Sequence, residues 1–87
     1  MEIPEILADI AAIVKKKDAD YGRAFDMACA NFGNSYAASK IFEKMCRIVK
    51  LTKCPPEVES EALEDSLRDC IGYCALYLRR LSQEKGE

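Results

Sequence analysis

The chain has 87 residues, of which 49% are apolar, and a formal net charge of −2. This length allows one domain, residues 1–87, and a folded chain of this size buries only about 60% of its unfolded surface, so we expect homo-oligomerisation to complete the core. The nearly balanced charge argues against indiscriminate binding to nucleic acid or to an anionic membrane.

Glycine and proline are scarce, and no segment alternates β-branched with polar residues. We therefore expect an all-α fold, a compact bundle of three long helices and one short helix. The first residues are acidic where a secretory signal is basic, and no apolar run approaches the roughly 20 residues of a membrane span, so we expect a soluble cytoplasmic protein. Histidine is absent, so any catalysis would use carboxylates, lysine, tyrosine or metal-bound water.

The first predicted helix begins near Pro4 and ends at three consecutive lysines, residues 15–17. These lysines complement the negative end of the helix dipole, and phosphate binding is the alternative. A short helix is expected from Arg23 to about Ala30, and Gly33 marks the turn that follows it. The five cysteines include no C-x-x-C pair, which favours reduced thiols over a disulfide framework or a zinc site.

The second long helix is expected over residues 35–51, and the third over residues 60–81 after the break at Pro55-Pro56. The second helix is basic and the third begins acidic, so the two should pack antiparallel. Residues 82–87 are expected to form a frayed polar tail. Helical spacing predicts that these two helices bury the following side chains: Ala37, Ala38, Ile41, Phe42, Met45, Ile48, Val49, Leu63, Leu67, Cys70, Ile71, Cys74, Leu78 and Leu81.

Three carboxylates, Glu61, Asp65 and Asp69, recur every fourth residue on the opposite side of the third helix. Like charges at this spacing repel, which leaves three interpretations: they neutralise the basic helix or face water, they hold Mg²⁺ with substrate phosphates on the basic helix, or they border a subunit interface. The interface is supported by four residues that continue the acidic stripe and predict a second partner for this helix: Gly72, Tyr73, Ala75 and Leu76.

Several residues between Lys15 and Leu78 follow one pattern: Lys17, Asp20-Tyr21-Gly22, Phe25, Phe32-Gly33, Glu43-Lys44, Arg47 and Glu61-x-x-x-Asp65-Ser66-Leu67-x-Asp69-x-x-x-Tyr73. The pattern resembles the nucleotide modification associated domain of the first type, found in phage and bacterial proteins. It is similar in helical pattern to the MazG-like all-α nucleoside triphosphate pyrophosphohydrolases. The resemblance implies a dimer or tetramer that binds Mg²⁺ through carboxylates on two adjacent helices.

Carried onto this chain, the resemblance implies the following site: Glu43, Glu61, Asp65 and Asp69 as metal ligands, Lys40, Lys44 and Arg47 on phosphates, and Tyr21 stacked on a base. One departure concerns the Glu-x-x-Glu pair of MazG-like enzymes, because Glu43 is followed three residues later by Cys46. The loss of one ligand favours binding over turnover.

Three functions follow as hypotheses. The first is binding of a nucleotide or related phosphorylated molecule at an interhelical or intersubunit cleft, with Mg²⁺-dependent pyrophosphohydrolysis as its enzymatic form. The second is non-catalytic sequestration of a nucleotide, including a defence signal. The third is a protein–protein adaptor, which would expose an apolar patch around Tyr73, Leu76 and Tyr77.

Overall fold

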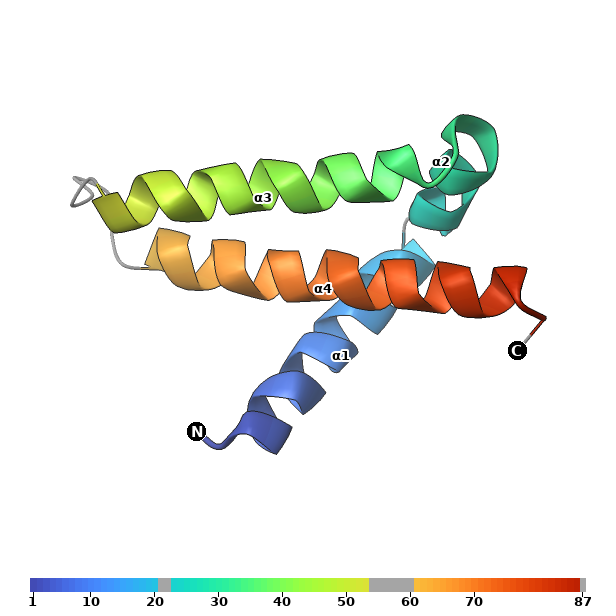
Figure 1. Ribbon diagram of the computed structural model, residues 1–87. Coiled ribbons are helices and arrows are strands. Elements are labelled where there is room, and N and C mark those ends of the chain that lie inside the picture. The colour runs from blue at the N-terminus through green and yellow to red at the C-terminus, as the bar shows by residue number, and fades with distance from the viewer. Residues whose placement is uncertain (21–22, 54–60, 87) are drawn as a thin grey trace.

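The computed structural model describes residues 1–20, 23–53 and 61–86, and it describes Glu61 by its backbone alone. Every regular element within these ranges is a helix: α1 (Ile3–Asp20), α2 (Ala24–Phe32), α3 (Ser35–Lys53) and α4 (Glu61–Glu84) (Figure 1). The all-α class with three long helices and one short helix is therefore confirmed. Among these helices, none combines the length and apolarity needed to cross a bilayer.

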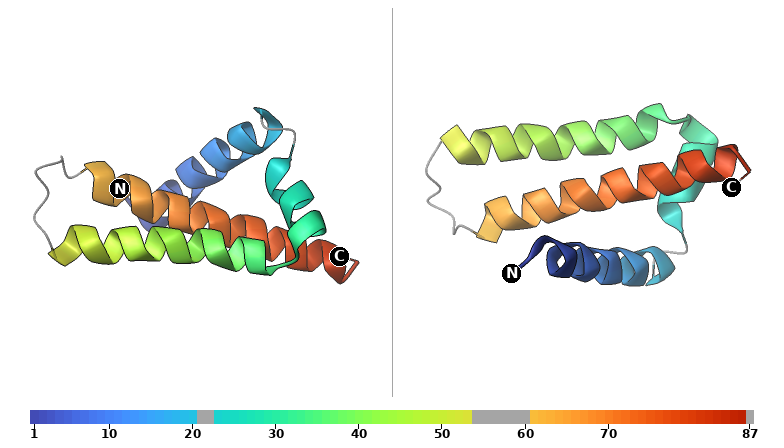
Figure 2. Two further views of the ribbon diagram at one scale, coloured as in Figure 1. Left: turned by 90° about the horizontal axis from the view of Figure 1, so that it is seen from above. Right: turned by 60° about the horizontal axis from the view of Figure 1, so that its bottom comes forward.

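The two longest helices, α3 and α4, lie side by side and antiparallel as a hairpin (Figure 1). A salt bridge from Lys44 Nζ to Asp69 Oδ2, 3.0 Å long, joins the basic helix to the acidic one. The predicted pairing of these helices is thus confirmed. Helix α2 packs near the start of α3, and α1 crosses α4 obliquely (Figure 2).

Helix α1 approaches α4 closely at Gly72. A Cβ atom at this position would lie 3.0 Å from Cγ2 of Val14, so only glycine fits without displacement of that side chain. A few residues later, the Arg79 guanidinium donates hydrogen bonds to both Asp18 carboxylate oxygens, at 3.0 and 3.2 Å, and to Asp26 Oδ2 at 3.1 Å. This ion-pair network joins α1, α2 and α4.

The hydrophobic core is small and centres on Phe25. Its ring packs edge-on against Tyr36, with centroids 5.8 Å apart, and tilted against Tyr73 at 6.2 Å. Cys29 and Ala37 are buried beside it, and Leu76 and Tyr77 close the cluster from α4. The cluster holds α2, the start of α3 and the C-terminal half of α4 together.

The structure corrects the predicted burial of α4. Leu67 and Leu78, expected in the core, are 44% and 68% exposed, whereas Tyr73 and Leu76, expected to face another subunit, pack against the core. The reason is that α1 docks on the side of Gly72, where close approach is possible. Residues of α3 that were expected to be buried are exposed for the same reason: Phe42 at 69%, Met45 at 52% and Val49 at 46%.

The helix ends also differ from expectation. Helix α4 extends to Glu84, so the tail expected from residue 82 is largely helical. Glu84 is held by Arg80, whose Nε lies 3.5 Å from its Oε1, and by Asn34, whose Nδ2 donates to Oε2 at 3.3 Å. Gly33 ends α2 with a φ of 82°, as the turn prediction required.

Candidate functional site

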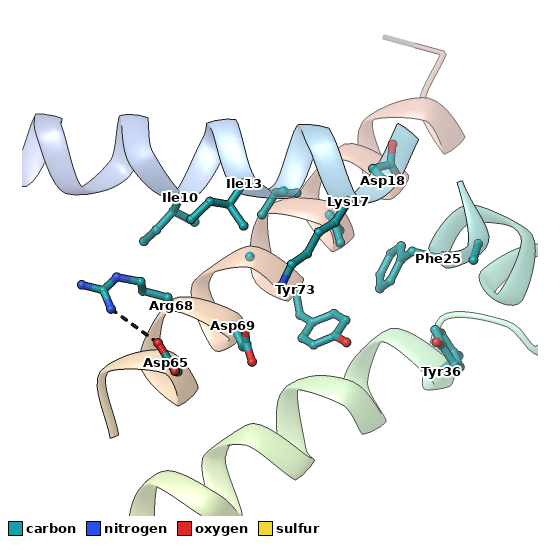
Figure 3. Close-up of a pocket in the computed structure, with 14 residues that line it drawn as sticks. Ile10, Ile13, Lys17, Asp18, Phe25, Tyr36, Asp65, Arg68, Asp69 and Tyr73 are labelled. Carbon is teal, nitrogen blue, oxygen red and sulfur yellow. Dashed lines mark ion pairs between the residues drawn. The ribbon is translucent and has the colours of Figure 1, made fainter. Parts of the chain in front are cut away.

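An open cleft of about 600 Å³ lies between α1, α2 and α4, and the start of α3 closes it at one end (Figure 3). This volume lies within the range of small-molecule sites, about 300–1000 Å³. The cleft forms because α1 crosses α4 at an angle, so the two helices diverge on either side of Gly72. It lies within one chain.

The cleft is apolar and aromatic on two sides. Ile10, Ile13 and Val14 line it from α1, because they follow the helical spacing of a single face. Across from them, the rings of Phe25, Tyr36 and Tyr73 meet at the end near α2 (Figure 3). Two of these three rings end in a hydroxyl, which can donate or accept a hydrogen bond.

Two cations line the same cleft. Lys17, in the last turn of α1, extends across the cleft toward Tyr73 (Figure 3) and forms no ion pair with any residue in the described ranges. Arg68 enters from α4 and lies 3.7 Å from Glu64 Oε2 and 3.8 Å from Asp65 Oδ1. Both of these pairs are long and solvent-exposed, so they hold Arg68 weakly.

Three carboxylates also line the cleft. Asp65 and Asp69 stand one turn apart on α4, and Asp69 is bound to Lys44. Asp18 differs from them because the hydrogen bonds from Arg79 lower its pKa below the ordinary value. Asp18 is therefore committed to the ion-pair network, whereas Asp65 and Asp69 are available for exchange of partners.

The predicted phosphate-binding residues lie on α3, outside the cleft lining. Lys40 Nζ lies 3.4 Å from Glu43 Oε2 and 5.7 Å from the centre of the Tyr36 ring. The negative charge of Glu43 raises the pKa of Lys40. Lys44 is bound to Asp69, and Arg47 is exposed.

The predicted metal ligands are separated into two groups. Asp65 and Asp69 line the cleft together, whereas Glu43 pairs with Lys40 on α3. Tyr21 and the side chain of Glu61 lie outside what the structure describes. Within its described part, no three acidic or cysteine side chains lie close enough to hold one metal ion.

The four described cysteines are free, and Cys29 is the buried one, while Cys46 is exposed. Cys70 and Cys74 are half-buried one turn apart on α4. None of these four side chains forms a disulfide in the structure, and Cys54 lies outside the described residues.

Comparisons with protein-family models, with curated proteins and with solved structures each returned no match. Function is therefore inferred from the cleft itself. Sequence patterns missed two of its residues, Tyr36 and Arg68. Arg68 carried a signal, since it is the single basic residue within an otherwise acidic run, but its contact with the space under α1 depends on the crossing of the helices.

Proposed function

We propose that this chain binds a phosphorylated small molecule, foremost a nucleotide, in the cleft between α1, α2 and α4. The observation that carries the proposal is the presence of two cations, Lys17 and Arg68, on the walls of one cleft that ends in three aromatic rings. Cations and aromatic rings in a single small-molecule-sized cavity match a ligand with an anionic part and a flat apolar part.

Lys17 and Arg68 are suited to bind phosphate because little must be broken to free them. Lys17 has no ion-pair partner within the described residues, and the carboxylates near Arg68 are 3.7 and 3.8 Å away. Exposed pairs of this kind contribute about 0–1 kcal/mol, whereas a guanidinium can hold a phosphate through two parallel hydrogen bonds. Phosphate can therefore displace the carboxylates that now surround Arg68.

The aromatic end of the cleft suits a nucleobase. Phe25 is 7% exposed and serves as the buried base of the cluster, while Tyr36 and Tyr73 are half-buried and reach the cleft. Stacking of a base on such a ring contributes about 1–3 kcal/mol, and it works for every base because each has a flat face. The tyrosine hydroxyls add hydrogen bonds that could distinguish bases.

Mg²⁺ fits this cleft as a companion of the phosphates. It takes oxygen ligands, and in nucleotide sites it typically uses one or two carboxylates with phosphate oxygens and water. Asp65 and Asp69 provide two carboxylates on one face of α4. Asp65 is now paired with Arg68, which phosphate would engage, and Asp69 is paired with Lys44. These two residues would hold the ion, and bound Mg²⁺ would supply neutralisation of phosphate charge.

Binding without hydrolysis is the function proposed, because the carboxylates of the cleft are already assigned. Asp65 and Asp69 are needed for the cation, and Asp18 is held by Arg79. In the part of the chain that the structure describes, the cleft lining holds no further carboxylate that could orient an attacking water.

Isothermal titration calorimetry with nucleoside mono-, di- and triphosphates and cyclic nucleotides, each with and without Mg²⁺, tests the proposal. For the ligand that binds, Lys17→Gln should weaken affinity at least about tenfold, as expected for loss of one charge-assisted hydrogen bond. Lys16→Gln is the matched control, since the neighbouring lysine is exposed and does not line the cleft. Arg47→Gln tests the alternative phosphate site on α3.

Absence of binding to every compound would refute the proposal, and so would a Lys17→Gln protein that binds as tightly as wild type. A large loss of affinity in Arg47→Gln with none in Lys17→Gln would place the phosphates on α3 instead. Release of phosphate or pyrophosphate from the bound compound, absent in Asp65→Asn, would show that the chain is a hydrolase and not a binding protein.

A further inference from the structure

The α3–α4 hairpin has two sides of different character. Tyr36 and Lys44 of α3, and Asp69 and Tyr73 of α4, are directed to the side on which α1, α2 and the cleft lie. Helical spacing assigns to the opposite side a set of exposed and half-buried apolar residues, here termed the hairpin face: Phe42, Met45, Ile48 and Val49 of α3 with Leu63, Leu67, Cys74 and Leu78 of α4.

The hairpin face is exposed to an unusual degree. Phe42 and Leu78 are 69% and 68% exposed, and Met45, Val49 and Leu67 each exceed 40%. None of its eight members is charged. Their helical spacing is that of core positions, because members recur at intervals of three, four and seven residues on α3 and of four and seven residues on α4. The sequence thus encodes a second buried surface that this chain alone leaves uncovered.

The chain as a whole exposes more surface than a folded monomer of its mass requires. A folded monomer of 9.8 kDa is expected to expose about 5200 Å², and this chain exposes 6472 Å². The excess over the whole chain is roughly 1300 Å², which leaves room for a standard stable interface of about 800 Å² on each partner. Its radius of gyration, 14.2 Å, likewise exceeds the value of about 12 Å expected for 87 residues.

Charge around the hairpin face favours a second copy of this chain as the occupant. Lys50 and Lys53 are exposed near the end of α3, and Glu64 is exposed near the start of α4, at the same end of the hairpin. A two-fold axis parallel to the hairpin would place α3 of each copy against α4 of the other. The basic end of one copy would then meet the acidic start of its partner.

We infer that two copies of this chain dimerise through their hairpin faces and form a four-helix bundle, with a ligand cleft on each outer side. Antiparallel hairpins that pack in this way bury apolar stripes from all four helices in one core. The inference is independent of the proposed ligand, because the hairpin face and the cleft lie on opposite sides of the hairpin.

Sedimentation velocity of the full chain over a series of micromolar concentrations tests the inference. Wild type should sediment at twice the monomer mass of 9.8 kDa. Leu67→Lys or Met45→Lys should raise the dimer dissociation constant at least about 100-fold, because each buries an unpaired charge in the interface. Met27→Lys is the matched control, since Met27 is 62% exposed on α2, away from the hairpin face.

A wild-type chain that sediments as a monomer would overturn the inference, including one that binds lipid vesicles or another protein instead. Dimers that persist unchanged in both lysine variants would overturn it as well. Circular dichroism establishes whether the variants are helical.

Alkylation of the wild-type chain provides a second test that needs no substitution. Cys74 belongs to the hairpin face, and Cys46, which is exposed on α3, is not one of its members. Peptide mapping by mass spectrometry should show that the rate at Cys74 falls relative to Cys46 as protein concentration rises. A ratio that is constant with concentration would contradict dimerisation through this face.

Discussion

Arg79→Leu removes the guanidinium that joins the three helices around the cleft while keeping an apolar stem. The guanidinium makes three hydrogen bonds, at 3.0 and 3.2 Å to Asp18 and at 3.1 Å to Asp26. The side chains of these carboxylates are 12% and 15% exposed, so water cannot fully replace the lost donor. Arg23 stays beside them, 3.1 Å from Asp26 but 3.7 Å from Asp18.

Removal of one partner from a buried ion pair costs about 3–5 kcal/mol. The lower end applies here, because the Arg79 side chain is 34% exposed and Arg23 still compensates Asp26. We therefore expect the free energy of unfolding to fall by about 3 kcal/mol, a large share of the roughly 5–15 kcal/mol typical of a whole domain.

Urea denaturation followed by far-ultraviolet circular dichroism measures this loss, with all proteins at one concentration so that self-association contributes equally. Arg80→Leu is the matched control. Glu84, the ion-pair partner of Arg80, lies one turn away on the same helix, so Arg80→Leu should lower the free energy of unfolding by less than about 1 kcal/mol. An Arg79→Leu protein as stable as Arg80→Leu would refute the structural role of the network.

Three further predictions concern the same packing. The folded-state pKa of Asp18 is depressed below its ordinary 3.8, so the contribution of Asp18 to stability is complete above that value and is lost as pH falls through the lower folded-state pKa. Urea titrations at several pH values should therefore show that wild type loses more stability below about pH 4 than Asp18→Asn does. Parallel curves would contradict this prediction. Gly72→Ala adds a Cβ 3.0 Å from Val14 Cγ2. Its effect on the free energy of unfolding should therefore be more favourable in a Val14→Ala background than in wild type, by about 1 kcal/mol in a double-mutant cycle. Additive effects of the two substitutions would exclude the close approach. Burial raises the pKa of the Cys29 thiol, so iodoacetamide should modify Cys29 at least about tenfold more slowly than exposed Cys46 in peptide maps, and equal rates would place Cys29 at the surface.

The helices were predictable because their signals are local. Apolar spacing placed all four, Gly33 marked a turn that needs a positive φ, and the opposite charges of α3 and α4 predicted their antiparallel pairing. The end of α4 was not predictable, since Glu84 is held partly by Asn34, a residue 50 positions away. Local polarity indicated a frayed tail, whereas α4 continues to Glu84, whose side chain accepts a hydrogen bond from a distant segment.

The covered side of α4 could not be chosen from periodicity. The spacing showed two apolar sides, one with Leu67 and one with Tyr73, and gave no means to rank them. The choice depends on the close approach at Gly72 and on the Arg79–Asp18 pair, which are contacts between distant segments. The larger apolar side is the one left exposed, which is why a second copy of the chain is inferred.

The candidate site was predictable in part. The acidic repeat identified Asp65 and Asp69, and Lys17 was recognised as a basic residue with phosphate binding as an alternative role. Tyr36 and Arg68 were missed, because the cleft draws its lining from four helices and exists only where α1 crosses α4. No spacing within one helix records such a crossing.

A nuclear magnetic resonance titration of the labelled chain with a nucleoside triphosphate and Mg²⁺ tests the central claim most directly. If the cleft binds the ligand, the largest shifts will cluster at Lys17, Arg68 and Tyr73, which line it from two helices. Spectra that do not change, or shifts confined to Lys40 and Arg47 on α3, would contradict the account.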